Sequence, residues 1–157
     1  MLRSDWPAVE RIYLEGIATG NATFETESPG WEKWNSAHLP HSRLIANDGD
    51  SVVGWAALSS VSARRVYAGV AEVSVYVATS AQGKGIGKLL LTELIRQSEQ
   101  NGIWTLQAGI FPENASSLAL HKSRGFREVG RREKVGQLSG KWRDTVLLER
   151  RSAIVGR

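Results

Sequence analysis

A glycine-rich run occupies residues 82–87 and reads Gln-Gly-Lys-Gly-Ile-Gly. It follows an apolar, strand-like run that ends at Ala78, and it precedes leucines at helical spacing. Glycines let the backbone turn tightly, so the amides of residues 83–88 can converge on an anion. Helix N-termini also favour phosphate groups. The run therefore predicts a phosphate-binding loop.

The spacing of these glycines fits neither of two common phosphate motifs. A P-loop needs four residues between its first glycine and Gly-Lys-Ser/Thr, and a dinucleotide fingerprint needs Gly-x-Gly-x-x-Gly. Here Gly83-x-Gly85-x-Gly87 is followed by Lys88 and then leucines. A glycine-rich turn that binds no ligand is the alternative.

Two titratable side chains are candidates for proton transfer. Glu72 alternates with Val73, Val75 and Val77, so it points to the opposite face of a strand. For an amine substrate, which is mostly ammonium at neutral pH, a carboxylate can take the proton directly or through water. His121 has an unperturbed pKa of about 6.5 and could act as acid or base. The alternatives are a solvated carboxylate and a packed structural histidine.

The elements that would position these residues follow from periodicity and turn signals. Helices are expected over residues 5–20, 31–39, 85–101 and 112–125, and strands over 43–47, 51–60, 70–78, 103–110, 129–137 and 142–150. This order predicts an α/β (α+β) domain with a mixed sheet, over residues 1–151. Residues 152–157 are expected to be a frayed tail.

Composition limits the classes of function. With 157 residues and 41% hydrophobic content, the chain suits one domain. Its net charge of +4 comes from dispersed basic residues, which favours an anionic ligand over nucleic acid. The absence of cysteine excludes disulfides and thiolate sites, and three scattered histidines predict no metal site. No apolar stretch is of membrane-spanning length, so we expect a cytoplasmic protein with no membrane partner.

A second run, from Asn114 to Phe126, joins the glycine run in resembling one family. The spacing Gln-x-x-Gly-x-Gly is similar to the pyrophosphate loop of the GNAT superfamily of N-acetyltransferases, which holds the diphosphate of acetyl-coenzyme A (acetyl-CoA). The second run resembles the GNAT helix whose asparagine contacts the pantetheine arm. Four residues before its Gly-Phe pair the family usually has a tyrosine acting as general acid, and this chain has His121.

Further motifs resemble the phosphinothricin and methionine sulfoximine acetyltransferases within that superfamily. They are Thr23-Phe24, Arg64-x-x-Tyr67, the run from Glu72 to Val77, Leu120-His121, and the run from Gly140 to Asp144. The similarity extends from Ile12 to Leu148. Two departures are a first strand clipped to residues 1–3 and an atypical segment at residues 26–41, near the expected substrate entrance.

The resemblance implies a GNAT fold, a single domain with a mixed, mostly antiparallel central sheet flanked by helices. It implies transfer of acetyl from acetyl-CoA to the α-amine of a small amino-acid analogue such as phosphinothricin, methionine sulfoximine or methionine sulfone. Glu72 and His121 would be catalytic. The residues implied at the acetyl-CoA site are Val75, Tyr76, Val77, Gln82, Gly83, Lys84, Gly85, Ile86, Gly87, Lys88 and Asn114. Those implied at the substrate are Phe24, Arg64 and Tyr67.

The resemblance also implies a homodimer whose C-terminal strands approach the neighbour's pocket. We then expect Trp142 to lie in the core or at the dimer contact rather than at the substrate. Other functions stay open, namely acetylation of another small amine or a protein N-terminus, and a non-catalytic acyl-CoA sensor. The atypical segment at residues 26–41 would discriminate between the two enzyme functions if its pocket proved open and acidic, whereas the presence of both Glu72 and His121 argues against a sensor.

Overall fold

A single mixed sheet of six strands, in the order β1-β2-β3-β4-β6-β5, organises the chain. The computed structural model describes all 157 residues. The strands are β1 Leu44–Asp48, β2 Ser51–Ser60, β3 Val70–Val77, β4 Thr105–Ile110, β5 Arg127–Leu138 and β6 Lys141–Arg151. The helices are α1 Trp6–Ala18, α2 Trp31–Ala37, α3 Ile86–Gln100 and α4 Ala115–Ser123, with short 3-10 turns at Arg3–Asp5, Arg65–Tyr67 and Thr79–Ala81. The predicted fold class is confirmed, and each expected helix and strand is present.

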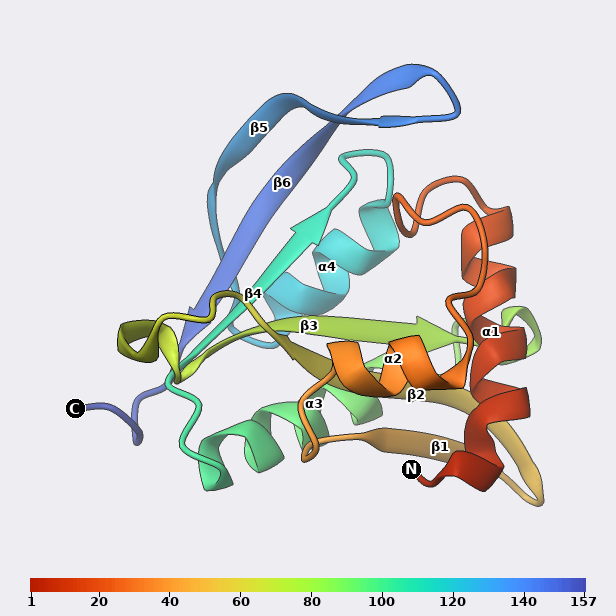
Figure 1. Ribbon diagram of the computed structural model, residues 1–157, viewed down its shortest axis with the longest axis horizontal. Helices are drawn as coiled ribbons and strands as arrows, with labels where there is room; N and C mark the ends of the chain where they lie inside the picture. The colour runs from red at the N-terminus through yellow and green to blue at the C-terminus, as the bar shows by residue number, and fades with distance from the viewer.

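The helices cover both faces of the sheet. A Cβ atom at Gly54 of β2 would lie 2.9 Å from Leu90 of α3, whereas the next residue, Trp55, packs edge-on against Tyr13 of α1. Because successive residues of a strand point to opposite faces, α1 and α3 lie on opposite sides of the sheet. Helix α2 joins α1 through Trp34, which also contacts Trp55, and Figure 1 shows α1 and α2 together in front of the sheet.

Strands β3 and β4 form the only parallel pair, and they pair over a short distance. Three residues of each strand are in register, from Val70 opposite Thr105 to Glu72 opposite Gln107. Beyond that point β3 continues to Val77 and β4 to Ile110, but the two strands no longer pair with each other. Figure 1 shows them diverging. The sheet is therefore split at its centre.

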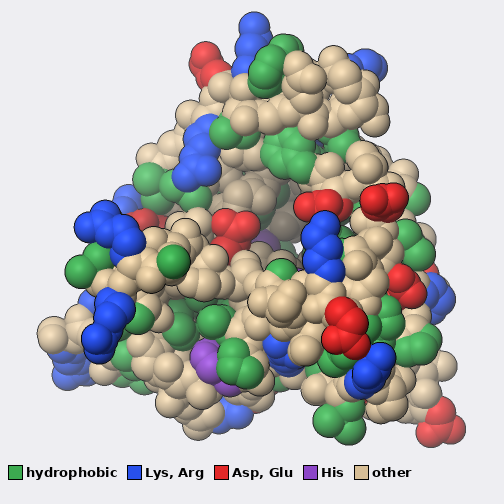
Figure 2. Space-filling model, in the orientation of Figure 1, with side chains coloured by type: hydrophobic (Ala, Val, Ile, Leu, Met, Phe, Trp, Pro, Cys, Tyr) green, Lys and Arg blue, Asp and Glu red, His purple; other side chains and the backbone are tan.

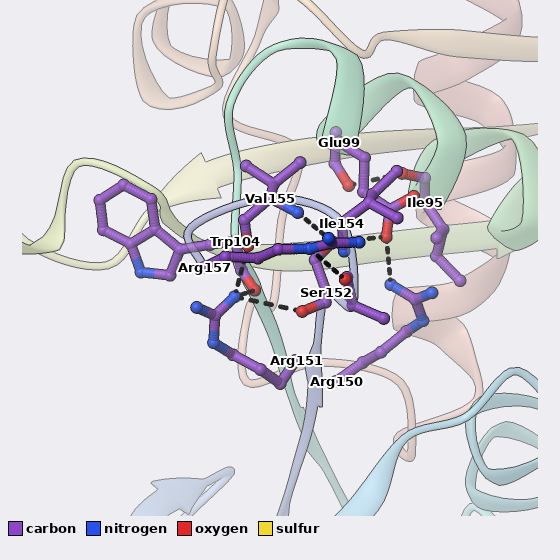
Figure 3. Close-up of polar contacts among 11 residues, drawn as sticks. Ile95, Glu99, Trp104, Arg150, Arg151, Ser152, Ile154, Val155 and Arg157 are labelled. Carbon is purple, nitrogen blue, oxygen red and sulfur yellow. Dashed lines mark hydrogen bonds and ion pairs between the residues drawn. The ribbon is translucent and has the colours of Figure 1, made fainter.

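The last six residues form no helix or strand, but several contacts hold them (Figure 3). Ser152 is buried, its amide donates to the carbonyl of Trp104, and its hydroxyl donates to Glu99, which also accepts from Arg150. Arg151 donates to the carbonyls of Trp104 and Val155. The sequence pattern predicted fraying here because two of these partners, Trp104 and Glu99, lie 47 and 53 residues away along the chain.

Residues 3–5 form a 3-10 turn that leads into α1. None of the helices combines the length and apolar character needed to cross a bilayer. No group of three or more histidine or carboxylate side chains is placed to hold a metal ion.

Candidate active site

The split between β3 and β4 opens into a cavity of about 360 Å³. Its walls come from α1, the segment after α1, α2, strands β2 to β4, α4 and one residue of β6. Figure 2 shows the hollow near the centre of this face. Six residues predicted for the site line it, namely Phe24, Glu72, Val75, Tyr76, Asn114 and His121.

Glu72 lies at the apex of the split. It is in the last paired position of β3, and its Oε2 accepts a hydrogen bond of 3.0 Å from Nε2 of Gln107, its partner on β4. This bond holds the carboxylate where the two strands separate. The side chain is exposed to solvent, so water can reach the carboxylate and carry a proton away from it.

His121 faces the same cavity from α4 and is only 4% exposed. Its Nδ1 lies 2.8 Å from the carbonyl oxygen of Ser117, one helical turn earlier. A carbonyl oxygen can only accept, so Nδ1 carries the proton and Nε2 of the neutral ring keeps its lone pair. Nε2 is buried and has no partner in the protein. Burial lowers the pKa of His121, and the bond to Ser117 offsets part of this effect. The resting state is a neutral imidazole that can accept a proton.

The glycine run forms an exposed turn at the N-terminus of α3. Gly83 and Gly85 have φ angles of +74° and +82°, in the region that other residues rarely adopt. The first helical bond of α3 runs from Leu89 to the carbonyl of Gly85, and none of the six amides of residues 83–88 donates a hydrogen bond within the protein. These free amides, with Lys84 and Lys88 beside them, suit a phosphate group.

A contact from α1 fixes the start of this turn. The amide of Thr79 donates a 2.7 Å hydrogen bond to Oε2 of Glu15. That bond, together with Arg11, lowers the pKa of Glu15, so the carboxylate stays ionised. The segment between β3 and the glycine turn is thereby tied to the opposite face of the sheet.

The other residues predicted for acetyl-CoA lie along the split. Val75 and Tyr76 line the cavity, whereas Val77 lies beyond it and points toward Gly87 of α3. Tyr76 presents its ring to the α1 side, stacked on Trp55 at 4.8 Å between centroids. Because β4 no longer pairs with this part of β3, alternate backbone groups of β3 face the split.

Asn114 has a structural task within the site. Its Oδ1 accepts a hydrogen bond from the amide of Ser117 and so caps α4, and its Nδ2 donates to the carbonyl of Asn21. One of its two amide hydrogens stays free for a ligand. The same side chain therefore caps the helix that carries His121 and hydrogen-bonds to the segment after α1.

The three residues predicted for the substrate fall in two places. Phe24 lines the cavity, packed edge-on against Phe111 at 4.8 Å. Arg64 and Tyr67 do not line it. Both are exposed on the segment before β3, where the guanidinium of Arg64 lies 5.4 Å from the ring centroid of Tyr67 and donates no hydrogen bond.

Arg143 packs against residues of the cavity wall without lining the cavity itself, and sequence reasoning gave it no role. Its guanidinium lies 4.1 Å from the centroid of Phe111 and donates to the carbonyl of Gly20, the side chain of Asn21 and the carboxylate of Glu113. It thus joins β6 to the segment after α1. The residue stands inside the run from Gly140 to Asp144, but only its contacts show what it does.

The aromatic wall of the cavity was also missed. Tyr13, Trp34, His38, Trp55 and Tyr76 line it together, and only Tyr76 was expected at the site. Trp34 and His38 belong to the atypical segment, and their rings stack at 4.1 Å. Trp31 and Trp34 are three residues apart, a spacing that indicates a helix face rich in aromatic rings. The neighbouring residues do not show which cavity that face would line.

Comparisons with known proteins agree with this arrangement. The acetyltransferase (GNAT) family matches residues 3–126. A phosphinothricin N-acetyltransferase of Alcaligenes faecalis is 36% identical over 155 residues, covering 93% of this chain and 77% of that protein. An L-methionine sulfoximine/L-methionine sulfone acetyltransferase of Pseudomonas aeruginosa is 30% identical over 153 residues, covering 93% of this chain and 88% of the relative.

Solved structures share the whole fold. A ribosomal-protein-alanine N-acetyltransferase from Brucella melitensis has a TM-score of 0.89 and 33% identity, with 97% of both chains covered. A phosphinothricin acetyltransferase from Sinorhizobium meliloti, in complex with acetyl-CoA, has a TM-score of 0.88 and 29% identity, covering 99% of this chain and 88% of the other.

Gly85→Val should weaken binding of coenzyme A, the diphosphate ligand expected from the sequence, by about tenfold or more. No protein atom lies within 4 Å of a Cβ at this position, so the added side chain occupies the space in front of the amides rather than the core. Calorimetric titration with coenzyme A measures the effect.

Gly49→Val is the matched control, because Gly49 also has a positive φ angle, of +58°, and open space around it, in the β1–β2 turn. Both variants carry the backbone strain, but only one lies in the glycine turn. Equal affinity for coenzyme A in the two folded variants would contradict the assignment.

Proposed function

We propose that this chain, which belongs to the acetyltransferase (GNAT) family, transfers the acetyl group of acetyl-CoA to the α-amine of a small amino-acid analogue. The observation that carries the proposal is the placement of Glu72 and the unpartnered Nε2 of His121 on one cavity, in a sheet whose split leads to the free amides of residues 83–88. The named activities of the two relatives support the substrate class.

The residues present fit acetyl-CoA. The glycine turn offers amides to a diphosphate, the free edge of β3 offers backbone groups to the pantetheine arm, and the cavity accommodates the acetyl group beside the amine. Bound acetyl-CoA supplies the thioester that the amine attacks. A backbone amide of β3 at the split could stabilise the charge that develops on the carbonyl oxygen.

Glu72 and His121 divide the proton transfers between them in this proposal. The carboxylate of Glu72 takes the first proton from the substrate ammonium, directly or through water, and frees the amine to attack. The attacking nitrogen then carries one proton too many. Nε2 of His121 accepts that proton and returns it to the departing sulfur. The tautomer held by Ser117 suits this order, because Nε2 must be unprotonated when the amine arrives.

Glu72→Gln and His121→Ala should each lower turnover by about 10² to 10⁴, which is the typical contribution of a positioned acid or base. Both variants should bind acetyl-CoA like the original protein, because neither residue belongs to the glycine turn. Thiol release measures turnover and calorimetry measures binding. His41→Ala is the matched control, since His41 does not line the cavity.

The pH dependence of turnover also tests the role of His121. Only neutral His121 can accept a proton, and burial lowers its pKa below the ordinary value of about 6.5. The acidic limb of turnover should therefore have its midpoint below pH 6.5, and His121→Ala should lose that limb. A limb of unchanged shape and midpoint in His121→Ala would assign it to another group.

Arg64→Ala should raise the KM for the amino-acid substrate about tenfold and leave the KM for acetyl-CoA unchanged. A charged hydrogen bond to a substrate carboxylate is of this size, and the Arg64 guanidinium has no other hydrogen-bond partner. Arg65→Ala is the control. A larger effect at Arg65, or none at Arg64, would remove Arg64 from the substrate site.

We expect a homodimer, and two features support it. Strand β5 is an edge strand with one neighbour, and Val129, Val135 and Trp142 are exposed on the β5–β6 hairpin. Light scattering should give twice the chain mass of 17.2 kDa, and Trp142→Glu should shift it toward a single chain. A monomer at every concentration tested would exclude this assembly.

A further inference from the structure

A row of polar side chains crosses the sheet at the place where β3 and β4 part. Glu72 of β3 is opposite Gln107 of β4. Gln107 is in turn opposite Glu149 of β6, which is opposite Arg127 of β5. Residues in register on neighbouring strands present their side chains to the same face of a sheet. The four side chains therefore lie next to one another, and carboxylates alternate with hydrogen-bond donors along the row.

Gln107 is the one side chain that holds Glu72. Its Nε2 donates to Oε2 of Glu72 at 3.0 Å, and no other side chain donates a hydrogen bond to this carboxylate. Glu72 also takes part in none of the ion pairs of the protein. Because the Glu72 side chain is exposed to solvent, it would be free to turn away from the cavity without this contact.

An amide suits the task of holding a base. It donates to one oxygen of the carboxylate, so the other oxygen stays free to take a proton. A lysine or arginine in the same place would form an ion pair and favour the ionised carboxylate, which weakens a base. A neutral donor fixes the direction of the carboxylate and lowers its basicity less.

The far end of the row leaves the Gln107 amide to Glu72. Glu149 is a second carboxylate beside Gln107 and could compete for the same amide. Arg127 donates to Oε1 of Glu149 and forms an ion pair with it, and none of the hydrogen bonds of Glu149 runs to Gln107. The Glu149 carboxylate is thus engaged on the β5 side of the row.

Gln107 does not itself line the cavity, whereas Glu72 does. The other titratable side chains that line the cavity with Glu72 are Tyr13, Glu25, His38, Tyr76 and His121. None of them hydrogen-bonds to Glu72. An effect of Gln107 on a reaction in the cavity therefore has to pass through the Glu72 carboxylate.

We propose that Gln107 is a positioning residue for acetyl transfer, and that its amide aims the Glu72 carboxylate at the substrate ammonium. The inference rests on the proposed function, in which Glu72 takes the first proton. Substitution of Gln107 should change the rate of the chemical step and leave the binding of both substrates unchanged, because the residue lies outside the cavity.

Gln107→Met keeps the length of the side chain and removes the donor. We expect kcat to fall by about tenfold to a hundredfold, the size of a lost hydrogen bond to a charged group, with both KM values unchanged. Gln97→Met is the matched control, because Gln97 also donates to a glutamate, at 2.9 Å to Glu93 of α3, outside the cavity. Equal kcat in the two variants, or a raised KM in place of a lowered kcat, would overturn the inference.

A double variant shows whether Gln107 acts through Glu72. Glu72→Gln has no carboxylate to aim, so adding Gln107→Met to it should lower kcat no further. A further loss by the same factor as in the single variant would mean that Gln107 acts elsewhere, and would overturn the inference while the proposed function stands. Normal turnover in Glu72→Gln alone would contradict the base assigned in the proposed function, and this inference with it.

Nuclear magnetic resonance reports the contact without turnover. The side-chain amide signal of Gln107, identified by its loss in Gln107→Met, should move as the pH is lowered through the range in which glutamates protonate. The movement should be kept in Gln97→Met and lost in Glu72→Gln. A signal that does not move, or one that moves equally in Glu72→Gln, would overturn the inference whatever the protein acetylates.

Discussion

The short pairing of β3 with β4 is the constraint on which the rest of the site depends. A parallel pair that continued past Glu72 and Gln107 would close the sheet and fill the space that is now a cavity. Because pairing stops there, the edge of β3 is left without a strand partner, and its free backbone groups are compatible with a ligand that lies along the strand. The hydrogen bond between Glu72 and Gln107 stands at the point of divergence.

Contacts from distant parts of the chain keep the split open and shaped. On one side, Asn114 caps α4 and holds the carbonyl of Asn21, so the helix that carries His121 and the segment that carries Phe24 are fixed together. Arg143 brings β6 to the same segment. On the other side, Gly16 lets α1 approach, because a Cβ there would lie 2.7 Å from the ring of Tyr76. Each contact joins residues that are far apart in the sequence.

The electrostatics of the cavity follow from burial. Both histidines of its wall lose water and become harder to protonate, and each uses Nδ1 to donate to a helical carbonyl four residues earlier. The wall therefore carries the negative charge of two glutamates and no positive charge. In the proposed reaction this field favours a substrate ammonium, and Glu72 would remove the proton that prevents its attack.

The sequence alone determined the features that depend on neighbouring residues. The glycine turn before α3, the alternation that places Glu72 opposite Val73, and the helix that begins after Asn114 all follow from local backbone preferences, and the structure has each of them.

Tertiary structure decided what depends on burial and on long-range contact. The tautomer and lowered pKa of His121 require knowing that α4 packs over the split, and the aromatic wall requires α1, α2, β2 and β3 to meet. The role of Arg143, the position of Arg64 outside the cavity and the contacts of Ser152 likewise depend on segments far away in the chain. The physical reason is that local preferences set the course of the backbone, whereas desolvation and side-chain contact arise only when distant elements pack together.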